Sequence, residues 1–549
     1  MLERDLLITY SEAPHPVGQT LADYLDVRGS YNPLQFALRL SPQVHQALSS
    51  APKGVCNIRD LSFEQVQAFS TYLHETIHWW QHCGSTAGLF ESLAHPLQTH
   101  SNLKFLREFL GVRGAKKSIL KYCLAEDENG VRPTAGADNA NVIVNNFMDI
   151  EFFSLLRTNP TMVHQVVKSP YFECIGHGAG IAYSNVVGTL STMFDGDNKF
   201  LPDPRAWESA FEDLRTKEVE GFYYGSPINI SPIGLFELFE GQARFSQLQY
   251  LHFGSSREFS WDDAKELGML ADEYVSAFKA FLKLTDSEWP ETIGDALVAL
   301  FLATIDMAIN PAEGFPKDIY CHETFITDTD PGMRFVFFCS LIKNGHSNLK
   351  TLVKDYSREE YLAITGELSG AMLTYSPLDA AATVASWAQA HAPIGQLIEE
   401  DRTSKFREEN LAIRLIFSRY VKFCRDKERS PQFFCWPGAW MAGERICDDG
   451  RRLFEGHEAL FVNKMGDNGI YPVLRPGVDQ KAIKQTFDDF YNATVLYDLT
   501  KQWMIKGGSF QYGYKWLSEK HSDDAMAHWA KANFERMYGV NPDAFEILP

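Results

Sequence analysis

The stretch SFEQVQAFSTYLHETIHWWQHCG, from Ser62 to Gly84, predicts a long amphipathic helix. Its apolar residues recur every three or four positions, which is the period of an amphipathic α-helix. Ser62 and Gln65 have the spacing of a capping box at a helix start, and Gly84 is a typical stop signal. We therefore expect one long helix over residues 62–83 with one face in the protein core.

Helical periodicity continues along most of the chain, so we expect a mainly α fold. Further helices are predicted over Asp138–Leu156, Ile233–Phe253, Trp261–Leu284, Thr292–Ile309, Arg358–Met372, Ser404–Arg425, Phe487–Met504 and Asp523–Met537. Strand-like segments are few and short, and they begin at Asp5 (DLLITY), Gln35 (QFALRL), Gly54 (GVCNI) and Glu458 (EALFVN). One small β element near the N-terminus is the expected departure from helix, and Gly466–Gly477 is a predicted loop.

The charge balance argues against two kinds of partner. Lysine and arginine number 51 against 71 acidic residues, which gives a net charge of -20. Such a chain lacks the positive charge that neutralises nucleic-acid phosphates or binds an anionic membrane surface. Its most apolar helical stretch, Ala296–Ile305, is about half as long as a membrane-spanning helix. We expect no nucleic-acid partner and no membrane partner.

The N-terminus and the cysteines favour a cytoplasmic protein. The opening residues, MLERDLLITYSEAPHP, include acidic side chains and no apolar run of signal-peptide length. The nine cysteines contain no C-x-x-C pair and are odd in number, which is typical of reduced thiols.

Three residues of the 62–83 helix, His74, Glu75 and His78, have the spacing of a metal site. Four residues advance an α-helix by about 6 Å, so the two imidazoles project from one face. Neutral imidazoles are good ligands for Zn²⁺, and a catalytic zinc site needs a third protein ligand and one position for water. Glu75 lies on the adjoining face, where its carboxylate could take a proton from that water.

His74, Glu75 and His78 on their helix resemble the active-site motif of the zincin metallopeptidases. This resemblance implies that both histidines bind Zn²⁺ and that Glu75 is the catalytic base. The continuation typical of the metzincin subgroup is absent, because Gln81 and Gly84 stand where that subgroup has glycine and histidine.

The gluzincin subgroup takes its third ligand from a glutamate on a second, downstream helix, in several families within an E-G-x-A sequence. Here Glu240 begins Glu-Gly-Gln-Ala inside a predicted helix, with Ser231 as the expected N-cap and Gly254 as the expected end. The resemblance therefore implies Glu240 as the third zinc ligand. Three acidic residues remain alternatives: Glu237, Asp149 and Glu151.

Several neighbours of these motifs carry weaker expectations. A glycine inside a helix costs about 1 kcal/mol relative to alanine, so Gly241 is expected to allow close approach of the two motif helices. His82 lies about 12 Å along the helix axis from His74, too far to share one ion, and is expected to be solvated. Trp79 and Trp80 are expected in the core, with the wall of a substrate cleft as the alternative.

A zincin often has a tyrosine or histidine that stabilises the oxyanion of the tetrahedral intermediate. The sequence offers five candidates, each with a structural role as the leading expectation: His177, Tyr223, Tyr224, His252 and His322.

The resemblance implies a zinc-dependent metallopeptidase that hydrolyses peptide bonds in a protein or peptide substrate. The length of the chain suggests that its additional helices select one protein substrate or bind a regulatory protein partner. The alternative is a non-catalytic helical scaffold or partner-binding protein with a structural or inactive metal site. A di-iron site would need a second helical E-x-x-H, and the other occurrence, Glu12 to His15, lies in a proline-rich stretch.

A chain of 549 residues is long enough for several packed units. We divide it into an N-terminal segment with short strands (residues 1–60), a zincin-like catalytic region with a helical insertion (61–285) and a large helical C-terminal region (286–549).

Overall fold

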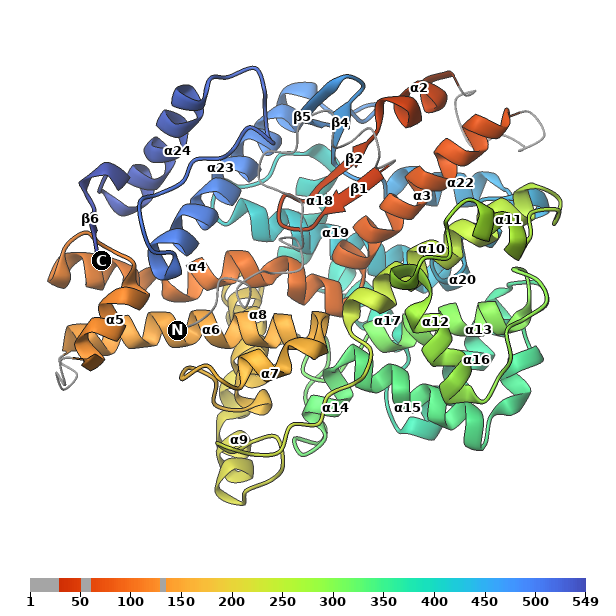
Figure 1. The fold of residues 1–549 in the computed structure, drawn as a ribbon, viewed down its shortest axis with the longest axis horizontal. Coiled ribbons are helices and arrows are strands. Elements are labelled where there is room, and N and C mark those ends of the chain that lie inside the picture. The colour runs from red at the N-terminus through yellow and green to blue at the C-terminus, as the bar shows by residue number, and fades with distance from the viewer. Residues whose placement is uncertain (1–28, 51–60, 129–134) are drawn as a thin grey trace.

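The computed structural model describes residues 29–50, 61–128 and 135–549 (Figure 1). The strands predicted from Asp5 and Gly54 lie outside these residues. Within the described part, helices form most of the molecule and the strands are short, so the predicted mainly α class with a small N-terminal β element is confirmed.

The first half of the chain contains α2 (Pro42–Ser50), α3 (Phe63–Gly84), α4 (Thr86–Arg113), α5 (Ile119–Glu128), α6 (Ala135–Thr158), α7 (Val163–Val166), α8 (Ile175–Phe194), α9 (Glu208–Thr216), α10 (Leu235–Gly254), α11 (Trp261–Glu266) and α12 (Asp272–Thr285). The second half contains α13 (Ala296–Ile309), α14 (Phe325–Thr329), α15 (Pro331–Asn344), α16 (Arg358–Met372), α17 (Pro377–Ala390), α18 (Ala392–Thr403), α19 (Leu411–Arg429), α20 (Pro431–Cys435), α21 (Pro437–Trp440), α22 (Asp448–Gly456), α23 (Gln480–Ile505) and α24 (Asp523–Tyr538). Short 3₁₀ helices are η4 (Pro160–Met162), η5 (Pro204–Ala206), η6 (Ser347–Thr351), η7 (Gly443–Arg445) and η8 (Pro542–Ala544).

Helix α3 begins and ends as its sequence predicts. The Ser62 side chain accepts a hydrogen bond from the Gln65 backbone N–H, and the Gln65 side chain accepts one from the Ser62 N–H. This reciprocal capping box satisfies two N–H groups that the first turn leaves without helical partners. At the other end Ser85 caps both α3 and α4, so the two helices meet at a corner of one residue.

Helix α10 starts later than predicted. Its N-cap is Gly234 and not Ser231, and the Glu237 carboxylate accepts a hydrogen bond from the Gly234 N–H at 2.9 Å. Ser231 instead accepts a hydrogen bond from the Ile233 N–H within the preceding turn. The predicted end at Gly254 is confirmed.

Two other predicted helices are interrupted. The segment 261–284 forms α11 and α12, and Gly268 has a positive φ of 69° in the turn between them. The segment 404–425 was predicted as one helix, but Ser404 and Asn410 have left-handed backbone conformations before α19 begins. Left-handed residues end a right-handed helix, which is why the apolar period alone misjudged these boundaries.

The larger sheet joins distant parts of the chain in the order β1–β2–β4–β5, with strands β1 (Gly29–Asn32), β2 (Ala37–Leu40), β4 (Phe461–Lys464) and β5 (Asp467–Pro472). Strands β1 and β2 form an antiparallel hairpin, β2 pairs with β4 in parallel, and β4 and β5 form a second hairpin. The predicted strands from Gln35 and Glu458 correspond to β2 and β4, whereas β5 lies in the predicted loop. A second, two-stranded sheet pairs β3 (Lys116–Lys117) with β6 (Glu546–Ile547).

Helix α3 lies at the centre of the fold, in contact with α2, α4, α10 and α19 and with β1 and β2 (Figure 1). Helices α4 and α6 pack side by side on one side of it, and the sheet lies on another. One continuous hydrophobic cluster includes side chains from all three predicted regions, from Phe36 to Phe545. The division at residues 60 and 285 stays a prediction.

Candidate metal centre

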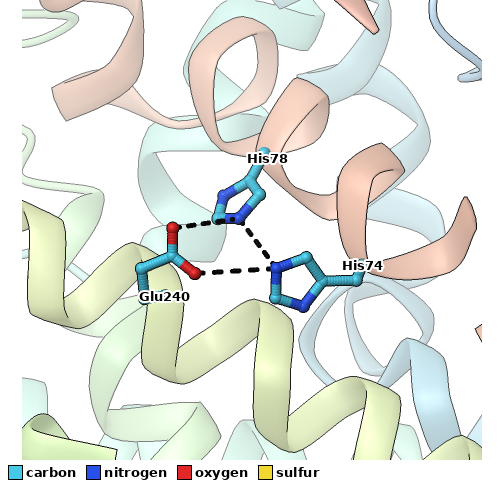
Figure 2. Close-up of side chains that lie close together, drawn as sticks. All are labelled: His74, His78 and Glu240. Carbon is cyan, nitrogen blue, oxygen red and sulfur yellow. Dashed lines mark hydrogen bonds and ion pairs between the residues drawn. The ribbon is translucent and has the colours of Figure 1, made fainter. Parts of the chain in front are cut away.

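The side chains of His74, His78 and Glu240 converge from α3 and α10 (Figure 2). The two histidine Nε2 atoms are 3.1 Å apart, and the Glu240 carboxylate oxygens lie 3.6 Å from His74 Nε2 and 3.4 Å from His78 Nε2. Ligands at about 2.1 Å around a tetrahedral zinc ion are separated by about 3.4 Å. Two imidazoles and a carboxylate at this spacing are a suitable ligand set for Zn²⁺.

A glutamine amide orients one of the two histidines. The Gln81 Oε1 atom accepts a hydrogen bond from His78 Nδ1 at 2.8 Å, so Nε2, which faces Glu240, is the nitrogen that would bind a metal ion. The Gln81 amide donates to the Phe239 carbonyl at 2.8 Å and to Gln242 Oε1 at 3.0 Å. Gln81 therefore fixes the His78 tautomer and links α3 to α10, a task that outer-shell groups perform in metal sites.

The electrostatics of the three residues favour a bound cation. Burial alone would raise the pKa of Glu240, but the charge of His78 and hydrogen bonds from both histidines hold it well below its usual range. Burial lowers the pKa of His74 to about 4, whereas Glu240 outweighs the effect of burial on His78 and raises its pKa to about 9. Glu240 is thus held ionised, as a metal ligand must be, and a bound cation would take the place of the charge on His78.

Glu75 is 5% exposed and lies under strand β1. A Cβ at Gly29 would lie 2.8 Å from Glu75 Cγ and 2.9 Å from its Oε1, so only glycine lets the strand pass this side chain. Burial raises the pKa of Glu75 to about 7; His78 opposes this shift and Glu240 adds to it. A carboxylate with a pKa near 7 can both accept and return a proton near neutral pH.

Arg244 and Tyr274 extend the site beyond the residues that the sequence motifs identify. The Arg244 guanidinium lies 3.8 Å from the centre of the Tyr274 ring, which is 6.1 Å from the ring of His74. Both side chains are half-buried. Arg244 follows Glu240 by one helical turn and could have been found from that spacing, but nothing in the sequence connects Tyr274 of α12 with α3.

A cavity of about 120 Å³ opens beside His78 and Glu240. Both motif helices contribute to it, together with the β1–β2 hairpin, α4, α6, α19 and α23. Its walls are mostly apolar and include Phe36, Phe239, Ile416 and Phe490.

The alternative third ligands have partners of their own. Glu237 caps α10, as described above, and Asp149 faces His177 at 3.3 Å. Glu151 accepts a hydrogen bond from Gln98 at 2.7 Å and lies 3.6 Å from Lys501. Of the four acidic candidates, the structure brings Glu240 to the two histidines.

The candidates for oxyanion stabilisation make contacts away from the metal group. His177 pairs with Asp149, His252 bonds the Phe259 carbonyl at 2.8 Å, and the His322 ring packs against Phe211. Tyr224 is exposed, and Tyr223 lies beside it in the same turn.

The structure corrects the expectations for His82 and Gly241 and decides between the two alternatives for Trp79 and Trp80. His82 is 8% exposed and not solvated, because α4 and β1 cover the end of α3. A Cβ at Gly241 would lie 3.2 Å from the Phe301 ring and 3.3 Å from the Ala277 Cβ, so this glycine allows close approach of α13 and α12 and not of α3. Trp79 and Trp80 are core residues: Trp79 packs on the Phe36 ring, and Trp80 donates a hydrogen bond to the His457 carbonyl.

Among the described residues, His74, His78 and Glu240 form the one group of three that could hold a metal ion. No helix in the described ranges is long and apolar enough to cross a membrane. Comparison with protein-family models, curated proteins and solved structures finds no match to this chain.

Proposed function

We propose that the protein is a zinc-dependent metallopeptidase in which His74, His78 and Glu240 hold the ion. The convergence of two Nε2 atoms and a carboxylate at tetrahedral ligand spacing carries this proposal. When bound, Zn²⁺ supplies a Lewis acid that polarises a carbonyl and acidifies water. The same three-ligand arrangement supports the resemblance to gluzincins.

Glu75 is the proposed general base. Its burial beside the metal group suits a carboxylate that takes a proton from the attacking water. The same carboxyl group can then give this proton to the amine that leaves when the peptide bond breaks. Tyr274 and Arg244, on the half-buried side next to His74, are the proposed donors to the developing oxyanion.

The position of β1 favours an extended peptide as the substrate. In the part of the chain that the structure describes, β1 is an edge strand of the sheet, and its Gly29 lies against Glu75. An edge strand can bind an extended peptide through main-chain hydrogen bonds. We propose that the substrate adds to the outer edge of β1, next to the metal group.

The test combines metal analysis with hydrolysis of unstructured peptides. Glu75→Gln should keep one zinc ion per chain and lower kcat by about 10²–10⁴-fold, because the amide cannot accept the proton. Glu240→Gln should weaken zinc affinity by more than about 100-fold, since even outer-shell changes cost about 10–100-fold.

Glu237→Gln is the matched control, because Glu237 lies one turn earlier on α10 and caps the helix. This variant should keep both zinc and activity. Wild-type protein that binds no zinc, or an unchanged kcat in Glu75→Gln, would contradict the proposal and favour a non-catalytic scaffold.

A further inference from the structure

Apart from His78 and Glu240, the cavity beside the metal group is built from residues that the proposed chemistry does not use. It begins at His78 and Glu240 and continues between His82, Phe239 and, on α19, Ile416. A cavity of about 150 Å³ with apolar walls can bind benzene, so about 120 Å³ with an opening at the metal group suits the ring of a large side chain.

The charged residues along this cavity are compensated by partners. Glu91 faces Arg157 at 3.4 Å, and Glu151 faces Lys501 at 3.6 Å. His95 also lines the cavity and stays neutral, because burial and two nearby lysines lower its pKa to about 3. A cavity without net charge favours an uncharged occupant, since a buried charge without a partner is costly.

Apart from Glu240 of the metal group, two polar groups in the cavity wall lack hydrogen-bond partners. The hydroxyl of Tyr31 and the Nδ1 atom of His82 are buried, and neither has a hydrogen-bond partner among the described residues. Their rings lie 5.4 Å apart, next to the turn of α3 that carries His78. Buried polar groups are normally paired, and a ligand in the cavity with a hydrogen-bonding group would satisfy these two.

We propose that this cavity is the specificity pocket of the site and takes a tyrosine side chain of the peptide, next to the scissile bond. This assignment rests on the proposed function. The apolar walls hold the ring, and Tyr31 and His82 bond its hydroxyl. The pocket then rejects lysine, arginine and acidic side chains because no unpaired charge in its wall can compensate them.

A peptide series tests the assignment by binding and by cleavage. The residues on either side of the scissile bond are changed in turn to Tyr, Phe, Ala, Lys or Glu. Zinc-loaded Glu75→Gln should bind the tyrosine peptide at one position at least about tenfold more tightly than the lysine or glutamate peptide. Wild-type kcat/KM should show the same order.

Two wall variants connect this preference to the cavity. Ala412→Leu, on α19, should lower affinity for the tyrosine peptide at least about tenfold and leave the alanine peptide unchanged, because the added atoms occupy the pocket. His82→Phe should reduce the preference for tyrosine over phenylalanine to about one, since the ring nitrogen is lost. Ala388→Leu, on α17 outside the cavity, is the control and should change neither preference.

The outcomes separate the two proposals. Equal binding of tyrosine and lysine peptides, or an Ala412→Leu effect of the same size on every peptide with zinc retained, would overturn the pocket assignment. Absence of zinc or of any cleavage, with selective binding of the tyrosine peptide retained, would overturn the proposed function and support the pocket.

Discussion

At the scale of single residues, Gln81 shows how the candidate metal site is held together. Its amide accepts a hydrogen bond from His78 and donates two to α10 (Phe239 and Gln242), so one side chain controls both the ligand tautomer and the distance between the motif helices. The Gln81 amide is uncharged, whereas metal-binding histidines are often oriented by a carboxylate.

Gln81→Leu should weaken zinc affinity by about 10–100-fold, because His78 loses the acceptor that fixes its tautomer. The measurement is competition with a chelator of known affinity. Gln249→Leu provides a control on α10, where Gln249 is buried and donates a hydrogen bond to Tyr356. It should lower stability without changing zinc affinity, and an equal loss of affinity in both variants would assign Gln81 a structural role only.

The sequence predicted those parts of the site that depend on local geometry. His74 and His78 share a face because helical spacing places them there, and Glu240 followed from a resemblance in its local motif. Tyr274 could not be predicted, because its place beside His74 depends on how α12 packs against α10. The burial of His82 was missed for the same reason, since other elements cover it.

At the scale of elements, the corner between α3 and α4 depends on glycine. A Cβ at Gly88 would overlap the carbonyl oxygen of Gln81, so α4 can turn closely across α3 only if this residue has no side chain. Gly84, at the end of α3, has a similar function, because a Cβ there would overlap the ring of Phe423 on α19.

Gly88→Ala should lower the free energy of unfolding by about 1–3 kcal/mol, as expected for an overpacked contact with the backbone. It should also weaken zinc binding, because the added Cβ would displace Gln81, which orients His78. Gly111→Ala is the matched control on the same helix, where a Cβ meets nothing within 4 Å. That variant should gain up to about 1 kcal/mol, and urea unfolding measures both. Equal effects of Gly88→Ala and Gly111→Ala on the free energy of unfolding would contradict a close contact between Gly88 and the Gln81 carbonyl.

Helices α3, α16 and α24 were predicted to within a residue or two, whereas α8 and even well-capped helices such as α4 and α17 were not predicted. The sequence of α8, IGHGAGIAYS at the start, contains three glycines that lower helix propensity. Two of them allow close packing. A Cβ at Gly176 would overlap the ring of Phe222, and a Cβ at Gly178 would lie 3.3 Å from the Asp149 carbonyl oxygen. Tertiary packing stabilises this helix against its local preference.

At the scale of the whole molecule, buried neutral histidines couple stability to pH. Burial lowers the pKa of His82 and of His95 to about 3 and that of His100 to about 4. Below pH 6.5 the unfolded chain protonates these histidines while the folded protein does not. The free energy of unfolding is therefore unaffected by these histidines above pH 6.5 and decreases as the pH falls below that value.

Between pH 6.5 and pH 5, each such histidine should lower the free energy of unfolding by about 2 kcal/mol. The midpoint of urea unfolding should move to lower urea over this range. His95→Gln removes one titrating group, so the free energy of unfolding should fall less steeply between pH 6.5 and pH 5. Its dependence on pH above pH 7 should not change. A stability that is constant from pH 7 to pH 5 would contradict this account.

The pairing of β2 with β4 has a consequence for the way the chain reaches its fold during synthesis. Leu38 lies opposite Val462, and the Asn463 side chain exchanges two hydrogen bonds with the Leu40 backbone. A nascent chain has made α3 and α10 long before it emerges with the strand that completes this sheet. Closing so long a loop is slow and entropically costly. The hairpin that carries Gly29 over Glu75 therefore acquires its sheet partner late, after the whole of the chain from α2 to α22 has been made.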